Sequence, residues 1–384
     1  MVKRLELQSV DLSGKTEELR NEVRSFLKEE LEKGSFVPHC DSWLSKYDPE
    51  FSRKLGQRGW LGMTWPKKYG GHERTALERY VVTEELLAIG APVAAHWFAD
   101  RQSGPLLLRY GNESQKAEIL PSIARGEVYF SIGLSEANSG SDLASISTSA
   151  KKVDKGWLLN GSKVWTSGAH FSHYMMTLCR TSPRTENRHE GFSQLIVDLS
   201  SPGVTIRPIR LMTGEHHFNE VILEDVFIPD RMAVGKIGDG WKQILAELAF
   251  ERSGPERFLS TFPLFVELIR VLQQDTLDKH RNISIGRLVA HLTTLRELSL
   301  GVARLLQKGI SPDITAALVK DLGTQFECKV AEVARLLVSL PSQNSNPRFN
   351  SLLATAILHS PGFTLRGGTT EILRGIIAKG AGIK

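Results

Sequence analysis

Cysteine is scarce in this sequence, and long apolar runs are absent. Only three of the 384 residues are cysteines, Cys40, Cys179 and Cys328, and they lie far apart without Cys-x-x-Cys spacing. This arrangement argues against a disulfide framework and a structural zinc site, and we expect no metal. There is no run of 18 apolar residues, and the first 20 residues lack the apolar core of a signal peptide. We therefore expect a cytoplasmic protein without a membrane span.

A Gly-x-Gly-x-x-Gly turn is also missing, which excludes the common strand-turn-helix site for a dinucleotide. The formal net charge of +5 is small for this length and is not the strong basic excess of a nucleic-acid-binding protein. A mild positive excess does suit an anionic, phosphate-bearing ligand. The hydrophobic share of 41% is typical of a globular protein, and the length predicts two or three packed subdomains.

The hydrophobic pattern along the chain changes twice. From about residue 15 to 125 the apolar spacing is helical, interrupted by the Pro-Lys-Lys-Tyr-Gly-Gly run at 66–71. From about 128 to 235, short apolar runs separated by turn residues predict strands, and the helical spacing then returns, with breaks at Ser311-Pro312 and 341–347. The sequence thus predicts an α+β fold. The predicted domains are a helical domain at 1–126, a β domain at 127–235 and a helical domain at 236–384.

Two polar, turn-rich segments lie in the strand region. The first, SEANSGSD at 135–142, directly follows an apolar strand. The second, NGSKVWTSG at 160–168, opens with Asn160-Gly161, a pair that favours tight hairpin turns, so we predict a turn there. Three side chains of these segments either face a cofactor or belong to ordinary turns and β-core: Ser135, Trp165 and Ser167.

These two segments, in this order, resemble the flavin-binding middle domain of the acyl-CoA dehydrogenases. The resemblance implies an N-terminal helical domain, a middle β-barrel or sandwich domain and a C-terminal four-helix bundle. It also implies FAD as cofactor and the α,β-dehydrogenation of an acyl-CoA thioester to the trans-2-enoyl-CoA. Similarity extends over essentially the whole chain, and the further motifs that carry it are residues 60–71, 124–127, 221–229, 238–241, 281–286 and 367–372.

The reaction implied by this resemblance needs a base that removes the α-proton. Many family members place a Glu at the position of Gly367, where this chain has none. Other members place it on a C-terminal helix directly before an Arg, which matches Glu251 and Arg252. Glu251 is therefore the implied base, although a solvated, salt-bridging Glu is the plain alternative. Glu247, one helical turn earlier, is the rival candidate.

The same resemblance assigns the remaining site residues. The backbone N–H of Gly367 would donate to the thioester oxygen as that oxygen gains negative charge. Ser141 would lie between the flavin and the thioester arm. Arg281 would reach the flavin of a neighbouring subunit, or else be a solvated charge. The other implied FAD contacts are Leu134, Ser135, Trp165, Ser167, Thr369 and Glu371.

Two departures from the family pattern bear on substrate and assembly. Ile285 replaces an aromatic residue, and the Gln-x-x-Gly-Gly-x-Gly run that many homotetramers use for the adenosine half of FAD is missing. In this respect the chain is more similar to bacterial members that act on bulky steroid side-chain or branched thioesters. We expect an acyl-CoA substrate, an electron-transfer flavoprotein as electron acceptor and no nucleic acid. The chain is expected to form a homo-oligomer (dimer or tetramer), because it keeps contacts on both sides of the cofactor; a heterotetramer with a related chain is the alternative.

Three alternatives to this function stay open. A flavin oxidase or monooxygenase of the same fold would need access for oxygen rather than a base, and the pair Glu251-Arg252 argues against it. A non-catalytic subunit would only complete the FAD site of another chain, and the retained flavin motifs argue against that. A carrier protein could present the acyl group in place of CoA.

Overall fold

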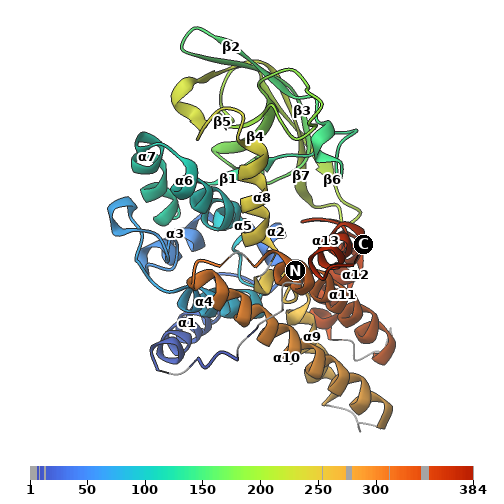
Figure 1. Cartoon of the computed structure of the whole chain (residues 1–384). Helices are drawn as coiled ribbons and strands as arrows, with labels where there is room; N and C mark the ends of the chain where they lie inside the picture. Colours follow the sequence, from blue (N-terminus) through green and yellow to red (C-terminus); the bar gives the residue numbers. More distant parts are fainter. Residues whose placement is uncertain are drawn as a thin grey trace. The chain divides into compact units, whose positions relative to one another are not determined.

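The computed structural model describes residues 7, 9–12, 14–252, 254–273, 279–310, 312–338 and 346–383, with the backbone alone described at 248–251 (Figure 1). The chain forms two compact units. We call Met1–Lys46, Thr75–Pro92 and Ala249–Lys384 the helical unit, and Tyr47–Arg74 with Val93–Leu248 the sheet unit. The division into three domains by residue number stays a prediction.

The helical unit consists of amphipathic helices that pack through their apolar faces. The first helix buries Leu19, Val23 and Phe26, as its sequence pattern predicts, and packs on α4. α4 begins at a capping box formed by Thr75 and Glu78. α11 lies beside α10, α12 and α13 and is the centre of the C-terminal part. The helices are α1 (Lys15–Glu32), α2 (Ser42–Ser45), α4 (Ala76–Ile89), η5 (Pro255–Arg257), α9 (Phe262–Leu272), α10 (Lys279–Gln307), α11 (Asp313–Leu337), α12 (Pro347–Phe363) and α13 (Thr370–Gly380).

The predicted break at Ser311-Pro312 is confirmed, because α10 ends at Gln307 and α11 begins at Asp313. The break predicted at 341–347 lies mostly outside the described residues, which resume at Asn346, the N-cap of α12. Of the helices that the structure describes, none is both long enough and apolar enough to cross a membrane.

The sheet unit begins with short helices. The predicted break at 66–71 is confirmed, because only one 3₁₀ turn forms there and Gly70, at φ 80°, ends it. The helices of this unit are α3 (Pro49–Gln57), η1 (Lys67–Tyr69), α5 (Ala94–Phe98), the π-helical turn η2 (Ala99–Ser103), α6 (Gly104–Tyr110), α7 (Glu113–Ala124), η3 (Leu143–Ser145) and η4 (Asp230–Met232). α8 (Gly240–Glu251) leads out of this unit at its C-terminal end.

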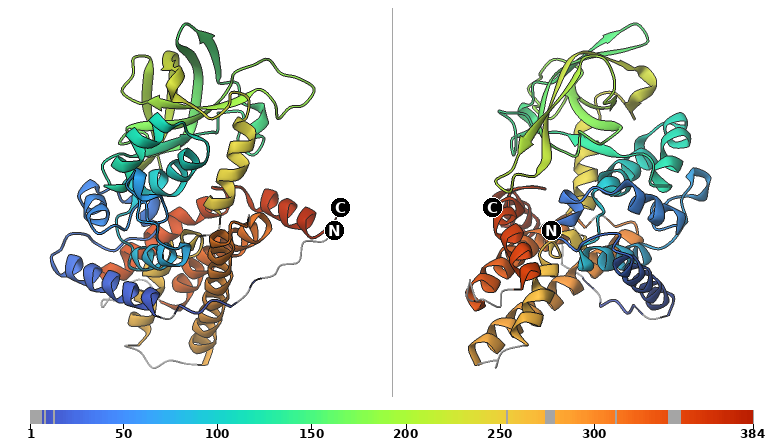
Figure 2. Two further views of the ribbon diagram at one scale, coloured as in Figure 1. Left: turned by 60° about the vertical axis from the view of Figure 1, so that its left-hand side comes forward. Right: turned by 180° about the vertical axis from the view of Figure 1, so that it is seen from behind.

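The predicted strand region forms one mixed sheet with the strand order β6-β7-β3-β2-β4-β5-β8, and β1 pairs in parallel with β4 (Figures 1 and 2). Its alternating apolar residues fill a core together with α6 and α7. Sequence analysis did not identify β2, which is short and lysine-rich, or β8, which has two residues. The strands are β1 (Phe130–Gly133), β2 (Ser149–Val153), β3 (Gly156–Ser167), β4 (Tyr174–Arg180), β5 (Phe192–Asp198), β6 (Val204–Arg210), β7 (His216–Pro229) and β8 (Ala233–Val234).

The hairpin turn predicted at Asn160-Gly161 is wrong, because β3 runs straight through these residues. The turn between β2 and β3 lies six residues earlier, at Asp154-Lys155, where Val153 pairs with Gly156 and Lys155 takes a positive φ of 56°. An Asn-Gly pair tolerates positive φ, but it does not by itself decide between a turn and a bulge.

Asn160 and Gly161 form a β-bulge instead. The register between β3 and β7 shifts there, and the Asn160 side chain exchanges two 2.9 Å hydrogen bonds with Asp225 of β7. Gly161 lies against Thr148, the residue directly before β2, since a Cβ atom at this position would come within 2.4 Å of Thr148 Oγ1. Glycine is therefore required here for a close backbone approach rather than for a chain reversal.

Candidate functional site

The segment that follows β1 is joined to β3 by three hydrogen bonds. The N–H of Val164 donates to the carbonyl of Ser135 over 2.9 Å, and the Lys163 ammonium donates to the carbonyl of Leu134 over 3.0 Å and to Glu136 Oε1 over 2.9 Å. The two polar segments predicted to bind a cofactor therefore lie side by side. The structure thus brings Leu134 and Ser135 next to the strand that carries the predicted tryptophan.

Glu136 and Lys163 form a buried ion pair beneath this segment. Glu136 also accepts hydrogen bonds from the backbone N–H groups of Ser147 and Thr148, at 2.7 and 2.9 Å, so it fixes both ends of the loop between β1 and β2. Burial alone would raise the pKa of Glu136, but the Lys163 ammonium and the bonds from Thr148 and Ser147 lower this pKa to about 2. Burial lowers the pKa of Lys163, and the carboxylate of Glu136 opposes that effect.

The low pKa of Glu136 predicts a pH dependence of stability. Because the folded-state pKa lies below the ordinary value of 4.5, the ionised carboxylate stabilises the fold fully above about pH 5, and this contribution is lost as the pH falls towards 2. A shift of this size corresponds to roughly 3 kcal/mol. Between pH 6 and pH 3 the thermal unfolding midpoint should therefore fall more steeply for the wild type than for Glu136→Gln. Glu186→Gln, in an exposed loop, should follow the wild type; parallel curves for all three proteins would contradict the prediction.

Three residues that support this loop were not predicted from the sequence: Glu136, Lys163 and Arg180. Arg180, at the end of β4, donates to the carbonyls of Ala144 over 2.8 Å and of Ile146 over 3.3 Å. It therefore holds the middle of the same loop. The sequence did contain a signal for two of them, a charged residue inside an otherwise apolar strand at positions 163 and 180. A charged side chain in the interior needs a partner.

Trp165 lies on the surface of the sheet unit, and the β-core alternative for it is wrong. Its side chain is 58% exposed and its φ is 57°, at the place where the register between β3 and β7 shifts between Lys163 and Thr166. A positive φ at a bulky residue is strained and is found most often where function requires it. Ser167 ends β3 and pairs with Phe218, whose ring meets the indole edge.

This surface fits a flavin. An exposed indole, a half-buried hydroxyl at Ser167 and the half-buried Ser135 offer one flat apolar face and polar groups beside it. A planar aromatic ring with hydrogen-bonding edges requires such a combination. Ser141 is exposed in the same loop, directly before Asp142, which forms an ion pair with Arg188.

In the helical unit, the turn before α13 brings two of the three predicted catalytic residues together. Gly367 and Gly368 have φ values of 69° and 98°. Arg252 Nε donates to the carbonyl of Gly367 over 3.2 Å, and Lys320 Nζ donates to the carbonyl of Gly368 over 2.7 Å. Arg252 and Gly367 are therefore in contact. Glu251 is the last residue of α8, and its side chain lies outside the described residues, so its role stays a prediction.

The rival base, Glu247, is held in the sheet unit. Its side chain is buried, and its carboxylate accepts a hydrogen bond of 3.3 Å from the side-chain amide of Gln194 in β5. A buried carboxylate that is bonded to a strand side chain is typical of a structural role.

Thr369 and Glu371 lie together at the beginning of α13. The Thr369 hydroxyl caps the helix by accepting from the N–H of Ile372, and Glu371 is in the first turn. Unpaired N–H groups at such a helix end favour the phosphate groups of a bound cofactor, which agrees with the predicted contacts. Arg281 is half-buried in the first turn of α10, and its predicted contact with a neighbouring subunit stays a prediction.

Arg366, directly before the glycine turn, is fixed by a buried ion pair. Its Nη1 and Nη2 atoms donate to the two oxygens of Asp41 over 2.7 and 2.6 Å. His359 Nδ1 lies 3.0 Å from Asp41 Oδ2, and the guanidinium group lies over the Trp43 ring. Burial would raise the pKa of Asp41, but Arg366 and His359 hold it well below its ordinary value. Bidentate pairing of this kind restrains the backbone of the turn.

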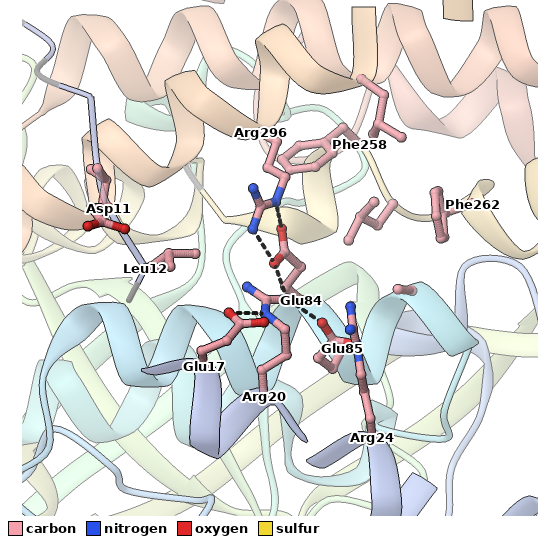
Figure 3. Close-up of a pocket in the computed structure, with 14 residues that line it drawn as sticks. Asp11, Leu12, Glu17, Arg20, Arg24, Glu84, Glu85, Phe258, Phe262 and Arg296 are labelled. Carbon is pink, nitrogen blue, oxygen red and sulfur yellow. Dashed lines mark hydrogen bonds and ion pairs between the residues drawn. The ribbon is translucent and has the colours of Figure 1, made fainter. Parts of the chain in front are cut away.

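The helical unit also contains a cavity of about 590 Å³, lined mainly by α1, α4 and α10 (Figure 3). Arg20 of α1 donates to Glu84 and Glu85 of α4, Arg24 donates to Glu85 over 2.8 Å, and Arg296 of α10 donates to Glu84 over 2.6 Å. These charges are paired with one another and join three helices. None of the predicted site residues lines this cavity, so we interpret the ion cluster as structural.

Comparison with known proteins identifies relatives of this chain. The N-terminal domain of acyl-CoA dehydrogenases matches residues 13–127, and their middle domain matches 131–226. Acyl-CoA dehydrogenase FadE34 of Mycobacterium tuberculosis is 34% identical over 336 residues, which is 86% of this chain and 46% of that protein. The chain spans 46% of the length of FadE34, and 65% and 63% of the lengths of two further acyl-CoA dehydrogenases from that organism. Other mycobacterial acyl-CoA dehydrogenases match over 95–96% of their length at 30–31% identity.

Two solved structures share the fold over nearly the whole chain. The first, titled Tcur3481-Tcur3483 steroid ACAD, has a TM-score of 0.85 and 27% identity, over 98% of this chain and 100% of that one. The second is the ChsE4-ChsE5 complex from Mycobacterium tuberculosis, with a TM-score of 0.84 and 28% identity, over 98% and 99%. These matches confirm the predicted α+β fold, with helices, then a middle sheet domain, then helices along the chain.

Proposed function

We propose that this chain, which belongs to the acyl-CoA dehydrogenase family, oxidises an acyl-CoA thioester between its α and β carbons and yields the trans-2-enoyl-CoA. The observation that supports this most directly is the contact of Arg252 with the carbonyl of Gly367. It joins the end of the helix that carries Glu251 to the turn that carries the candidate oxyanion donor.

Glu251 is the base in this proposal. It directly precedes Arg252, whose side chain contacts the turn, and this contact supports the proposal. Gly367 supplies no carboxylate, so Glu251 has no competitor at that position. Its carboxylate takes the α-proton, and the Gly367 N–H donates to the thioester oxygen while negative charge develops there.

FAD is the cofactor that we propose, and residues are assigned to it in each unit by itself. In the sheet unit, Leu134, Ser135, Trp165 and Ser167 would hold the ring system, and Ser141 would separate it from the thioester arm. In the helical unit, Thr369 and Glu371 would contact the phosphate and adenosine half, and Arg281 would serve a neighbouring subunit. When bound, FAD supplies the acceptor for the hydride from the β carbon.

A bulky acyl group is the substrate class that we propose. One structural neighbour is titled a steroid acyl-CoA dehydrogenase, and this chain shares its fold over its full length. A panel of thioesters tests the function and the substrate class together. The panel runs from short straight-chain to branched and steroid side-chain acyl-CoA, and turnover is measured with an artificial electron acceptor. Turnover of ring-bearing substrates is expected. An absence of reduction with every thioester would overturn the function, and preference for short straight chains would overturn the class. Electron-transfer flavoprotein is the proposed natural acceptor.

FAD binding should depend on Trp165. The purified protein is expected to be yellow with one non-covalent FAD per chain, and Trp165→Ala should weaken FAD binding roughly tenfold, because stacking on an aromatic ring contributes on the order of 1 kcal/mol. Fluorescence titration of the apoprotein measures this. Phe227→Ala removes another exposed aromatic ring of the same sheet and should leave the affinity unchanged. Protein that stays colourless with added FAD, alone or with a partner chain, would rule out the cofactor.

Assembly with a second, related chain is the arrangement that we propose. The titles of both structural neighbours join two protein names. The departures at Ile285 and in the missing adenosine-side run agree with a site that another chain completes. Large exposed apolar side chains occur on C-terminal helices, among them Val289, Leu336 and Leu358.

Expression with and without a related chain tests this assembly. Alone, this chain should be aggregated or depleted in flavin, and co-expression should yield a heterotetramer with one FAD per pair, measured by mass in solution and flavin absorbance. A homodimer or homotetramer with one FAD per chain, formed by this chain alone, would show that it is self-sufficient.

A further inference from the structure

Lys320 is a fully buried lysine in α11, and it contacts the glycine turn rather than solvent. Its ammonium donates to the carbonyl of Gly368 over 2.7 Å. Lysine is rarely buried completely, because removing an ammonium group from water costs several kcal/mol. A buried lysine that is bonded to a loop carbonyl therefore needs an explanation in terms of what that loop does.

The turn needs external support because it contains two consecutive glycines. Gly367 and Gly368 both have positive φ values, and glycine loses more conformational entropy on ordering than any other residue. Two cations restrain the pair: Arg252 holds the carbonyl of Gly367, and Lys320 holds the carbonyl of Gly368. Hydrogen bonds from charged donors are about twice as strong as neutral ones.

The orientation of these carbonyls decides where the N–H groups of the turn point. In a trans peptide the C=O and the N–H of one plane point in opposite directions. Because the carbonyls of Gly367 and Gly368 point at Arg252 and Lys320, the N–H groups of Gly368 and Thr369 point away from these cations. Neither of these N–H groups donates to an acceptor among the described residues. Each also becomes a better donor, since a cation on the carbonyl polarises the whole peptide group.

We propose that Lys320 is a positioning residue: it fixes the 368–369 peptide and thereby keeps the glycine turn, which carries the Gly367 N–H, ordered for the negative charge that develops on the thioester oxygen. This inference rests on the proposed dehydrogenase function, because it supplies a reason for the turn to be ordered before the substrate binds. Lys320 itself touches neither substrate nor cofactor in this assignment.

A purely structural role for Lys320 would be to tie α11 to α13. The neighbouring residue, Asp321, already does this, because it accepts a hydrogen bond of 3.2 Å from the exposed Arg374 of α13. Arg374→Met is therefore a matched control. It removes one positive charge and one contact between the same two helices, but it leaves both carbonyls of the turn bonded.

The experiment compares Lys320→Met, Lys320→Gln, Lys320→Arg and Arg374→Met with the wild-type holoenzyme. We measure kcat and KM with the best thioester of the panel, FAD content, and hydrogen exchange of the backbone over residues 364–373. Lys320→Met should lower kcat roughly 10- to 100-fold, somewhat less than the loss of an oxyanion donor itself, with KM and FAD content within threefold of the wild type. Lys320→Arg, which restores a cation, should recover part of kcat.

Two results would overturn the inference. One is a kcat of Lys320→Met within twofold of that of Arg374→Met, and the other is a loss of activity that only follows a loss of FAD. If Lys320→Met does not fold, Lys320→Gln, which keeps a neutral donor, takes its place with the same criteria.

Hydrogen exchange separates this inference from the proposed function. If the wild type reduces no acceptor with any thioester, the dehydrogenase proposal fails, and exchange still tests Lys320. Exchange of the Thr370 amide, which donates to the carbonyl of Thr364, should become at least tenfold faster in Lys320→Met and stay unchanged in Arg374→Met. Equal exchange in the two variants would show that Lys320 does not order the turn.

Discussion

Glu251→Gln should abolish most of the dehydrogenase turnover, with kcat lower by about 10²- to 10⁴-fold. The amide of glutamine has nearly the same shape as the carboxylate but cannot accept the α-proton. FAD content and thioester binding should stay close to wild-type values, because no binding contact is assigned to this side chain. Steady-state assays with an artificial electron acceptor, flavin absorbance and a spectral titration with an enoyl-CoA measure the three quantities separately.

Glu247→Gln is the matched control for this substitution. Glu247 is one turn earlier on α8, and its carboxylate is bonded to Gln194 of β5. The variant should keep turnover within a few-fold of the wild type, although its stability should fall somewhat, because a buried polar contact is changed. The reverse outcome, with Glu247→Gln inactive and Glu251→Gln active, would show that the base is on the other turn of the helix.

Asp41→Asn should destabilise the helical unit by about 3–5 kcal/mol, because it leaves the Arg366 guanidinium group without its buried counter-ion. For a unit of this size the thermal unfolding midpoint should fall on the order of 10 °C. Turnover should fall as well, since Arg366 directly precedes Gly367. Calorimetry and steady-state assays at neutral pH test both effects.

Asp11→Asn provides the comparison, because Asp11 is an exposed carboxylate of the same unit. Its midpoint should stay within 1 or 2 °C of that of the wild type, as is usual for surface substitutions. A fall of the same size in both variants would mean that net charge, and not the pair with Arg366, determines the effect.

Much of the fold follows from periodicity, and the exceptions have physical causes. The face of α1 with Leu19, Val23 and Phe26 was predicted because long amphipathic helices repeat regularly. Asn160-Gly161 was misread because the same backbone freedom serves a turn and a bulge, and only the partner strand β7 decides between them. β2 was missed because its alternation is hidden by lysines.

The residues of the candidate site also divide into those that could be predicted from the sequence and those that could not. Residues proposed to contact the flavin, such as Ser135 and Trp165, could be named from the sequence, because they lie in short motifs that resemble those of the family. The residues that hold these segments in place could not be named from the sequence. Glu136 contacts Lys163, and Arg252 contacts Gly367, only in the tertiary fold. A long-range partner leaves no local pattern in the chain.

The ion pair of Asp41 and Arg366 also sets an order of events during synthesis, since its partners are 325 positions apart in the chain. At typical elongation rates Asp41 leaves the ribosome on the order of 20–60 s before Arg366. Over that interval the residues of the sheet unit emerge as nearly one continuous run. α1 and α4 can pack on one another early, but α4 waits for its later partners η5, α9 and α10. The nascent chain therefore leaves one face of α4 uncovered until α10, which ends at Gln307, has been translated. Chaperone binding during translation is expected to concentrate on its N-terminal part.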